Sequence, residues 1–364
     1  MIKVAIVGVG NCASSVVQGV SYCKSGQKIV SLPFADLAGY GAEDIAFVAA
    51  FDVDARKVGL DLSEAIFAPP NCTYVFHPDV QHTGVTVQRG PTLDGIAPHM
   101  LAQSPQEAFR ESETASLTEA QVVDHLKAAG CEVMINFLPV GSQQATEFYA
   151  GCALLAGVAF VNAIPVFLAS DQTWAARFQA HGLPLLGDDF KAQLGATVLH
   201  RDLVNLFALR GVTLDRTYQL NVGGNTDFLN MMDSSRVNQK RQSKTESVQA
   251  VANTRMAAGD IRVGPSDYVP WLNDQKVGYV RLEGRLFGGA PMNIEVRLSV
   301  EDSPNAAAMA LAAIRCARIA LDRGQAGAIW EPCAFLFKSP PRQMNDHDAH
   351  ELLLRFAGGD GANG

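Results

Sequence analysis

The chain has 364 residues, a formal net charge of −8 and a hydrophobic fraction of 48%, which is typical of a globular protein large enough for two domains. The acidic balance argues against a general nucleic-acid-binding protein, because such proteins carry a broad basic face. No apolar run approaches the roughly 20 residues that cross a bilayer, and a strand that starts at once leaves no room for a signal peptide. Seven scattered cysteines without a CxxC pair predict reduced thiols in a cytoplasmic protein.

The first expected strand, KVAIV, runs directly into a glycine turn. Gly8, Gly10 and Ala13 form a G-x-G-x-x-A pattern that includes Asn11 and Cys12, and the apolar periodicity of a helix follows. In this context Gly8 permits the tight turn, Gly10 lets the backbone approach a pyrophosphate, and the helix N-terminus supplies N–H donors. A glycine turn can also serve packing alone. We predict a dinucleotide site formed by these five residues.

Asp52 ends the next expected strand, residues 45–51, where a carboxylate can bind the 2′-hydroxyl of an adenosine ribose. The gap from the glycines is about twice the usual gap of about 20 residues, and residues 25–43, rich in Gly, Pro and Ser, explain it as an insertion. A carboxylate here disfavours a 2′-phosphate and favours NAD over NADP, although Arg56 and Lys57 nearby weaken the choice. The alternative for Asp52 is a surface turn.

Helices and strands then alternate. We expect helices at 117–129, 142–156 and 171–180, and strands at 133–138, 158–161 and 183–186. Alternation of this kind predicts an α/β fold, a doubly wound parallel sheet with helices on both faces, whose ligands lie at the carboxyl ends of the strands.

Polar segments follow these strands at that edge of the sheet. Pro139 and Ser142 belong to the first segment, and Asp188, Asp189 and Lys191 belong to a later one, GDDFK. The two carboxylates and the lysine could orient a nicotinamide, hold a cation or bind a sugar hydroxyl. They could also cap the helix that is expected to begin near residue 192.

The alternation of helices and strands stops after a helix that ends near residue 209. Alternating strands at 216–222, 279–287 and 294–300 predict a largely antiparallel sheet with one covered face. We therefore predict a Rossmann-type domain of residues 1–200 and 301–364, interrupted by an inserted mixed α+β domain of residues 201–300.

A basic stretch lies within this insertion, after Asn225 and Asp227. If Lys240 and Lys244 are helical, their spacing places both on one face, where the two cations repel unless an anion binds between them. The alternative is a solvated basic loop. Further on, Asp302 opens the sequence DSPN. Its serine and proline suit the N-cap and first position of a helix, and Asp302 remains a candidate site residue.

Many segments occur together in one order: VAIVGVGNCASS, FVAAFDVD, QRGPTLDG, LPVGS, FVNAIPVF, GDDFKAQLGAT, NVGGNTDFLNM, SKT, GPSDYVPWLNDQK, LEGR, DSPN and FLFKSPP. In these motifs the chain resembles the myo-inositol-1-phosphate synthase family, particularly its shorter prokaryotic branch, from Val4 to about Pro341. It departs from the family pattern at Gln242, which replaces an apolar residue, and in the segment after Ile29.

The resemblance implies an NAD-binding Rossmann-type domain and an inserted domain that closes the site and builds a homotetramer. It implies the redox-neutral cyclisation of glucose 6-phosphate to an inositol phosphate. A related branch closes a five-membered ring from fructose 6-phosphate with the same fold and lysines. Family members differ over divalent or monovalent cations, and the sequence shows no set of metal ligands.

The resemblance also implies roles for particular residues. Lys276 would exchange the proton at the C5 oxygen, and Lys240 and Lys338 would act at the C1 oxygen and the phosphate. Lys244 would bind phosphate. The residues that would position hydroxyls and lysines are Asn225, Asp227 and Asp302.

Two other classes remain open at this point. A simple sugar-phosphate dehydrogenase would release NADH with turnover, whereas a cyclase recycles it. A non-catalytic NAD-binding regulator would be expected to lack the lysines. A free lysine, with a pKa of about 10.4, is a poor base at neutral pH. Crowding by other cations and burial would lower the pKa of one of them.

Overall fold

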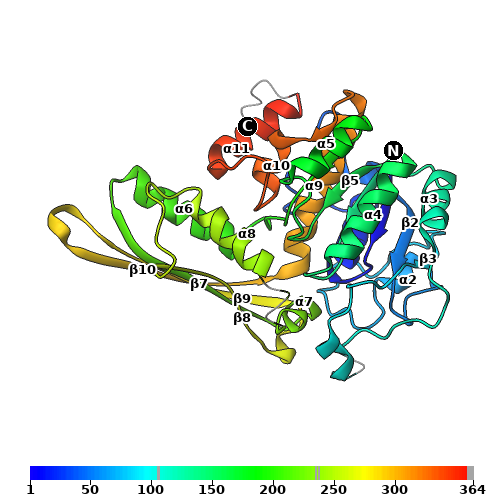
Figure 1. Ribbon diagram of the computed structural model, residues 1–364, viewed down its shortest axis with the longest axis horizontal. Helices are drawn as coiled ribbons and strands as arrows, with labels where there is room; N and C mark the ends of the chain where they lie inside the picture. The colour runs from blue at the N-terminus through cyan, green and yellow to red at the C-terminus, as the bar shows by residue number, and fades with distance from the viewer. Residues whose placement is uncertain (105–106, 234–235, 237, 359–364) are drawn as a thin grey trace.

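Two sheets organise the chain (Figure 1). The structure is a computed structural model that describes residues 1–104, 107–233, 236 and 238–358. One sheet has seven parallel strands, and the other has four strands and extends away from it.

The parallel sheet has the strand order β11-β6-β5-β4-β1-β2-β3. Its strands are β1 (Ile2–Val7), β2 (Ile45–Asp52), β3 (Val87–Arg89), β4 (Val133–Asn136), β5 (Ala159–Asn162), β6 (Pro184–Leu186) and β11 (Gly327–Ala328). From β1, the strand order continues through β2 and β3 in one direction and through β4, β5, β6 and β11 in the other. The crevice between β1 and β4 is therefore the topological switch point, where open α/β sheets bind their ligands.

Helices cover both faces of this sheet, as the alternation in the sequence predicts. Along β1, Val4 and Ile6 point into one core and Ala5 and Val7 into the other. The first core contains α1 (Asn11–Lys24), α9 (Asp302–Asp322), α10 (Trp330–Leu336) and α11 (Asp346–Phe356). The second contains α3 (Glu119–Ala128), α4 (Gln143–Ala156) and α5 (Gln172–Ala180).

The second sheet has the order β10-β9-β7-β8. Its strands are β7 (Thr213–Gly223), β8 (Ile261–Tyr268), β9 (Gln275–Arg285) and β10 (Pro291–Glu301). The antiparallel pairing of β7, β9 and β10 is confirmed. Sequence reasoning missed β8, which pairs parallel to β7 and contains Pro265. Proline is tolerated there because β8 is an edge strand.

Two helices, α6 (Ala196–Leu209) and α8 (Asn238–Gln249), cover one face of the second sheet, and the long β9–β10 hairpin projects from the body (Figure 1). The boundary predicted at residue 200 therefore falls inside a helix that packs on this sheet. The division into domains remains a prediction. Short helices complete the fold: α2 (Leu62–Ala65), α7 (Thr226–Asn230) and four 3₁₀ turns, at Ala42–Asp44, Pro98–Ala102, Pro270–Leu272 and Phe287–Gly289.

Two helix starts differ from expectation. Helix α6 begins at Ala196 rather than near residue 192, because the amides of Gln193 and Leu194 donate to Asn305 and hold the preceding turn out of the helix. Helix α9 begins at Asp302, so Ser303 is not its N-cap. No helix in the described part of the chain is long and apolar enough to cross a membrane.

Candidate active site

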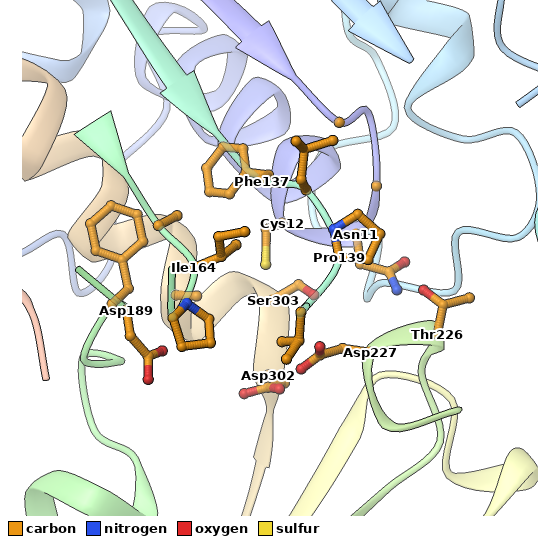
Figure 2. Close-up of a pocket in the computed structure, with 18 of the residues that line it drawn as sticks. Asn11, Cys12, Phe137, Pro139, Ile164, Asp189, Thr226, Asp227, Asp302 and Ser303 are labelled. Carbon is orange, nitrogen blue, oxygen red and sulfur yellow. The ribbon is translucent and has the colours of Figure 1, made fainter. Parts of the chain in front are cut away.

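A continuous pocket joins the two sheets. It starts at the glycine turn after β1, passes the carboxyl ends of the parallel strands and ends at the four lysines. Figure 2 shows Asn11 and Cys12 reaching it from the glycine turn, whereas Asp189, Asp227 and Asp302 lie toward its other end. The location is the one predicted from the strand order.

The glycine turn has the geometry that its two glycines require. Gly8 has a φ of +85°, and a Cβ there would lie 2.8 Å from the carbonyl oxygen of Phe137. A Cβ on Gly10 would meet no atom within 4 Å, so the backbone at this residue is open toward the pocket. The turn is fixed from both sides at Val9. The Val9 amide donates to Asp52 Oδ2 (2.6 Å), and the Val9 carbonyl accepts from Lys57 Nζ (2.7 Å).

The cations near Asp52 have other partners. Arg56 donates to Asp54 and to the carbonyl of Ala108 (2.8 Å), and Lys57 is buried beneath the turn. Burial lowers the pKa of Lys57, which the Asp52 and Asp54 carboxylates partly oppose. Neither side chain lines the pocket, whereas Asp52 does.

The other residues predicted at the cofactor end fall into two groups. Asn11, Cys12 and Pro139 line the pocket. Ala13 and Ser142 are buried behind it, and the Ser142 hydroxyl donates to the Pro139 carbonyl (2.6 Å).

Four lysines from three parts of the chain line the other end. Lys240 and Lys244 lie one turn apart on α8, as their spacing predicts for a helix, while Lys276 is on β9 and Lys338 follows α10. Three of them form ion pairs: Lys240 with Asp227 (2.5 Å), Lys276 with Asp302 (2.8 Å) and Lys338 with Asp189 (2.7 Å).

Lys244 differs from the other three lysines. It is 2% exposed, and among the described residues no carboxylate forms an ion pair with it. Burial lowers its pKa well below the usual value, and repulsion from Lys276, Lys240 and Lys338 lowers it further. The Asp189 carboxylate opposes this only in part. The ammonium form is therefore less favoured here than in an ordinary lysine.

The carboxylates keep the surrounding groups charged. Burial alone would raise the pKa of Asp302, but Lys276, Lys240 and Lys244 lower it overall. For Lys240, burial is outweighed by Asp227 and Asp189, which raise its pKa. For Lys338, burial lowers the pKa; Asp189 opposes this, while Lys240 and Lys276 add to it. Lys244, whose pKa is lowered further, is therefore the most affected of the four lysines.

Asp188 and Lys191, like Ala13 and Ser142, do not line the pocket. Asp188 is fully buried and accepts hydrogen bonds from the amides of residues 168–170 and from Asn162 Nδ2 (2.8 Å). Lys191 is also buried, and its Nζ donates to Asp346 (2.7 Å) and to the carbonyl of Ala334 (2.8 Å). Neither caps α6, because the turn before that helix is held by Asn305.

Asn225 lines the pocket and is also the N-cap of α7. Its Oδ1 accepts from the amides of Asp227 and Phe228, and its Nδ2 donates to Asp274 Oδ1 (3.0 Å). Asn225 therefore fixes the helix that carries Asp227, the partner of Lys240.

Sequence reasoning missed several polar residues of the site. Thr197, Gln219 and Ser303 line the pocket, and the Ser243 hydroxyl donates to Asp189 Oδ2 (2.8 Å). Ser243 precedes Lys244 within α8, so its position beside the lysines is the one available sequence signal for it. Across the described residues, no three His, Cys, Asp or Glu side chains are grouped so that they could hold a metal ion.

Comparison with known proteins gives consistent results. Residues 195–303 match the family model described as myo-inositol-1-phosphate synthase. The chain is 50% identical over 368 residues to inositol-3-phosphate synthase of Mycolicibacterium smegmatis and 48% identical over 364 residues to that of Corynebacterium glutamicum. Each alignment covers 98% of both proteins.

Solved structures with the same architecture include a myo-inositol-1-phosphate synthase-related protein from Thermotoga maritima, with a TM-score of 0.81 and 26% identity, and a protein named Ari2, with a TM-score of 0.77 and 32% identity. Each comparison covers 98% of both chains. With half of its residues identical to a relative along nearly its whole length, the chain belongs to the myo-inositol-1-phosphate synthase family.

Proposed function

We propose that the protein catalyses the reaction for which its relatives are named, the cyclisation of glucose 6-phosphate to 1D-myo-inositol 3-phosphate. The observation that carries this proposal is the lysine end of the pocket: four buried or half-buried lysines face one cavity, and a single one lacks a carboxylate partner among the described residues. A phosphorylated sugar that passes through oxyanions needs both features, since ammonium groups stabilise negative charge and a neutral amine accepts protons.

The residues at the opposite end fit NAD. The open backbone at Gly10 and the N-terminus of α1 would hold the pyrophosphate, and Asp52 would hold the adenosine ribose. Arg56 and Lys57 are committed to other partners, which supports NAD over NADP. When bound, NAD would supply a hydride acceptor for the sugar phosphate and return the hydride after ring closure.

Lys244 is the proposed proton acceptor. Its environment lowers the pKa of the amine, and the neutral amine is the form that can take a proton from a hydroxyl or from a carbon next to a carbonyl. The competing role, suggested by resemblance, is direct contact with the phosphate. A phosphate contact needs the ammonium form, which the three neighbouring lysines disfavour.

The paired lysines are proposed to bind oxygens of the substrate. Lys276 would act at the C5 oxygen, and Lys240 and Lys338 at the C1 oxygen and the phosphate, as the resemblance implies. Their aspartate partners hold each ammonium group in place, so the donors are oriented before charge develops on the substrate.

We also propose a homotetramer in the cytoplasm. The face of the second sheet opposite α6 and α8 carries an exposed row across three strands, Leu220, Tyr279 and Arg297. Phe287 is fully exposed at the tip of the β9–β10 hairpin. Burial against other copies would cover the apolar side chains of Leu220, Tyr279 and Phe287. Light scattering should therefore report four chains, and a monomer at working concentrations would contradict this assembly.

Product analysis tests the reaction itself. The purified protein is incubated with NAD and, separately, with glucose 6-phosphate or fructose 6-phosphate, and each product is identified by NMR without added NADH. Inositol phosphate without accumulation of NADH is the expected result. Stoichiometric NADH would instead indicate a dehydrogenase, and a five-membered carbocycle formed from fructose 6-phosphate would assign the protein to the related branch.

A further inference from the structure

Asp274 is a buried carboxylate at the junction of the two sheets. It lies directly before β9, is 1% exposed and does not line the pocket. Its carboxylate accepts four hydrogen bonds. Oδ1 accepts from Asn225 Nδ2 (3.0 Å) and Ser303 Oγ (2.8 Å), and Oδ2 accepts from the Ser303 amide (3.0 Å) and Thr73 Oγ1 (3.0 Å).

Two of these donors lead directly to ion pairs of the site. Asn225 caps α7, and that helix presents Asp227 to Lys240. Ser303 follows Asp302, the partner of Lys276, and the Asp302 amide donates to the Asp274 carbonyl (2.9 Å). Asp274 thus connects the two pairs through one carboxylate, without touching either lysine.

The fourth donor leads to the glycine turn. The Thr73 hydroxyl is within 2.8 Å of Ser15 Oγ on α1, and the Thr73 amide donates to Asn11 Oδ1 (3.1 Å), at the first residue of that helix. The carboxylate therefore links the start of α1, on the parallel sheet, to β9 and α7, on the other side of the pocket.

Fold stability alone does not explain why a charged group occupies this buried position. Among the described residues no lysine or arginine forms an ion pair with Asp274, and a buried carboxylate without such a partner is costly. Burial, together with repulsion from Asp302, raises the pKa of Asp274 to about 6. A neutral polar side chain would connect the two sheets with a smaller desolvation cost, but it could not accept hydrogen bonds from four donors at once.

We propose that Asp274 is a positioning residue, which fixes the Lys240–Asp227 and Lys276–Asp302 pairs relative to each other and to the start of α1. This inference rests on the lysine chemistry proposed above.

The test is Asp274→Asn. The side-chain NH2 group of the asparagine would face either the side-chain amide of Asn225 or the backbone N–H of Ser303. Both are donors that cannot turn away, so the connection to Asn225 or the connection to Ser303 is lost. We expect kcat to fall about 10²-fold, the order of effect of a misplaced reacting group, with KM for the sugar phosphate and the affinity for NAD unchanged. Activity is normalised to the concentration of folded, NAD-binding protein, so that a loss of stability alone does not change the measured kcat.

Asp61→Asn is the matched control. Asp61 is another largely buried carboxylate, and it accepts from the amides of Ser63 and Thr83 at the start of α2, outside the pocket. The same chemical change there should lower the melting temperature and leave kcat intact. Thr73→Val removes one donor from Asp274 but retains the carboxylate, and it should lower kcat less than Asp274→Asn. This variant decides the question if Asp274→Asn does not fold.

The outcomes are distinct. An unmodified protein that forms no inositol phosphate refutes the proposed function and the inference with it. An active parent with an equally active Asp274→Asn refutes the positioning role alone, as does a loss that appears entirely in KM. If Asp274→Asn does not fold, full activity of Thr73→Val refutes it.

Discussion

The two ends of the pocket are built in different ways. The proposed cofactor end is organised around one short backbone segment, the glycine turn, with Asp52 beside it. The lysine end consists of charged side chains from distant segments, such as Lys338 and Asp189, which are 149 residues apart in the chain.

This difference separates binding from chemistry. The backbone turn is shaped by the conformation of a few residues and needs no balancing charge. The lysine end requires carboxylates that neutralise its positive charges, and here three carboxylates form ion pairs with three of the four lysines. The excess lysine, Lys244, is the group whose protonation is easiest to change, so we expect substitutions at the lysine end to alter kcat and substitutions at the cofactor end to alter affinity.

The largest expected effect is that of Lys244→Met. Methionine fills the buried space without a charge or a basic nitrogen. We expect kcat to fall by about 10² to 10⁴, the range for loss of a general base, with little change in KM. Steady-state measurement of inositol phosphate formation checks both parameters.

Lys244→Arg separates the two roles considered for this residue. Arginine stays protonated and can still contact a phosphate, but it cannot accept a proton. We expect this variant to be as inactive as Lys244→Met. Substantial activity with arginine, or a defect of Lys244→Met confined to KM, would make Lys244 a phosphate ligand.

The next effect concerns two of the paired lysines. Lys276→Ala should prevent even the first oxidation, whereas Lys240→Ala should oxidise the substrate and stall before ring closure. Loss of one oxyanion stabiliser costs about 10² to 10³ in rate. Single-turnover absorbance of bound NADH should therefore stay flat in the first variant and rise and persist in the second. Normal cyclisation by both would remove these lysines from the mechanism.

The strand–turn–helix geometry at the glycine-turn end of the pocket could be predicted from sequence because its signals are local. A strand, two glycines and a helix fall within a few consecutive residues, and period-two burial along β1 follows from the apolar run itself. The lysine end has no such local signal. The four lysines could be grouped only by resemblance to a family, since the spacing of Lys240 and Lys244 indicated only a shared helix face and an anion between those two.

Other features depended on tertiary contacts that no pattern expresses. Lys191 turns away from the pocket because Asp346, 155 residues later, reaches it from α11. Strand β8 was missed because Pro265 is a residue that usually ends a strand. Asp274 lies within the motif NDQK, but only the fold brings Thr73, Asn225 and Ser303 to its carboxylate.

A smaller effect is expected at the cofactor end. Asp52→Ala removes a charged acceptor for a ribose hydroxyl and also the partner of the Val9 amide. A hydrogen bond to a charged group contributes about 1.5–3 kcal/mol, so we expect affinity for NAD to fall by about tenfold or more, with kcat at saturating NAD largely retained. Binding titrations with NAD and NADP check this. Tighter binding of NADP than of NAD by the unmodified protein would contradict the assignment of Asp52.

The smallest effect is one of stability and its dependence on pH, again at Lys244. Because the pKa of Lys244 in the folded protein lies below its ordinary value of 10.5, the unfolded chain binds the proton more tightly than the folded one does. The parent protein is therefore destabilised at low pH, and it regains that stability as the pH rises from the folded pKa toward 10.5. Lys244→Met lacks this proton, so its melting temperature should exceed that of the parent at acidic and neutral pH, and the difference should shrink at alkaline pH. Lys28→Met, at an exposed position, is the control and should show no such trend. If Lys244→Met is less stable than the parent at every pH, the folded state accommodates the Lys244 ammonium. Lys244 would then not be the proton acceptor.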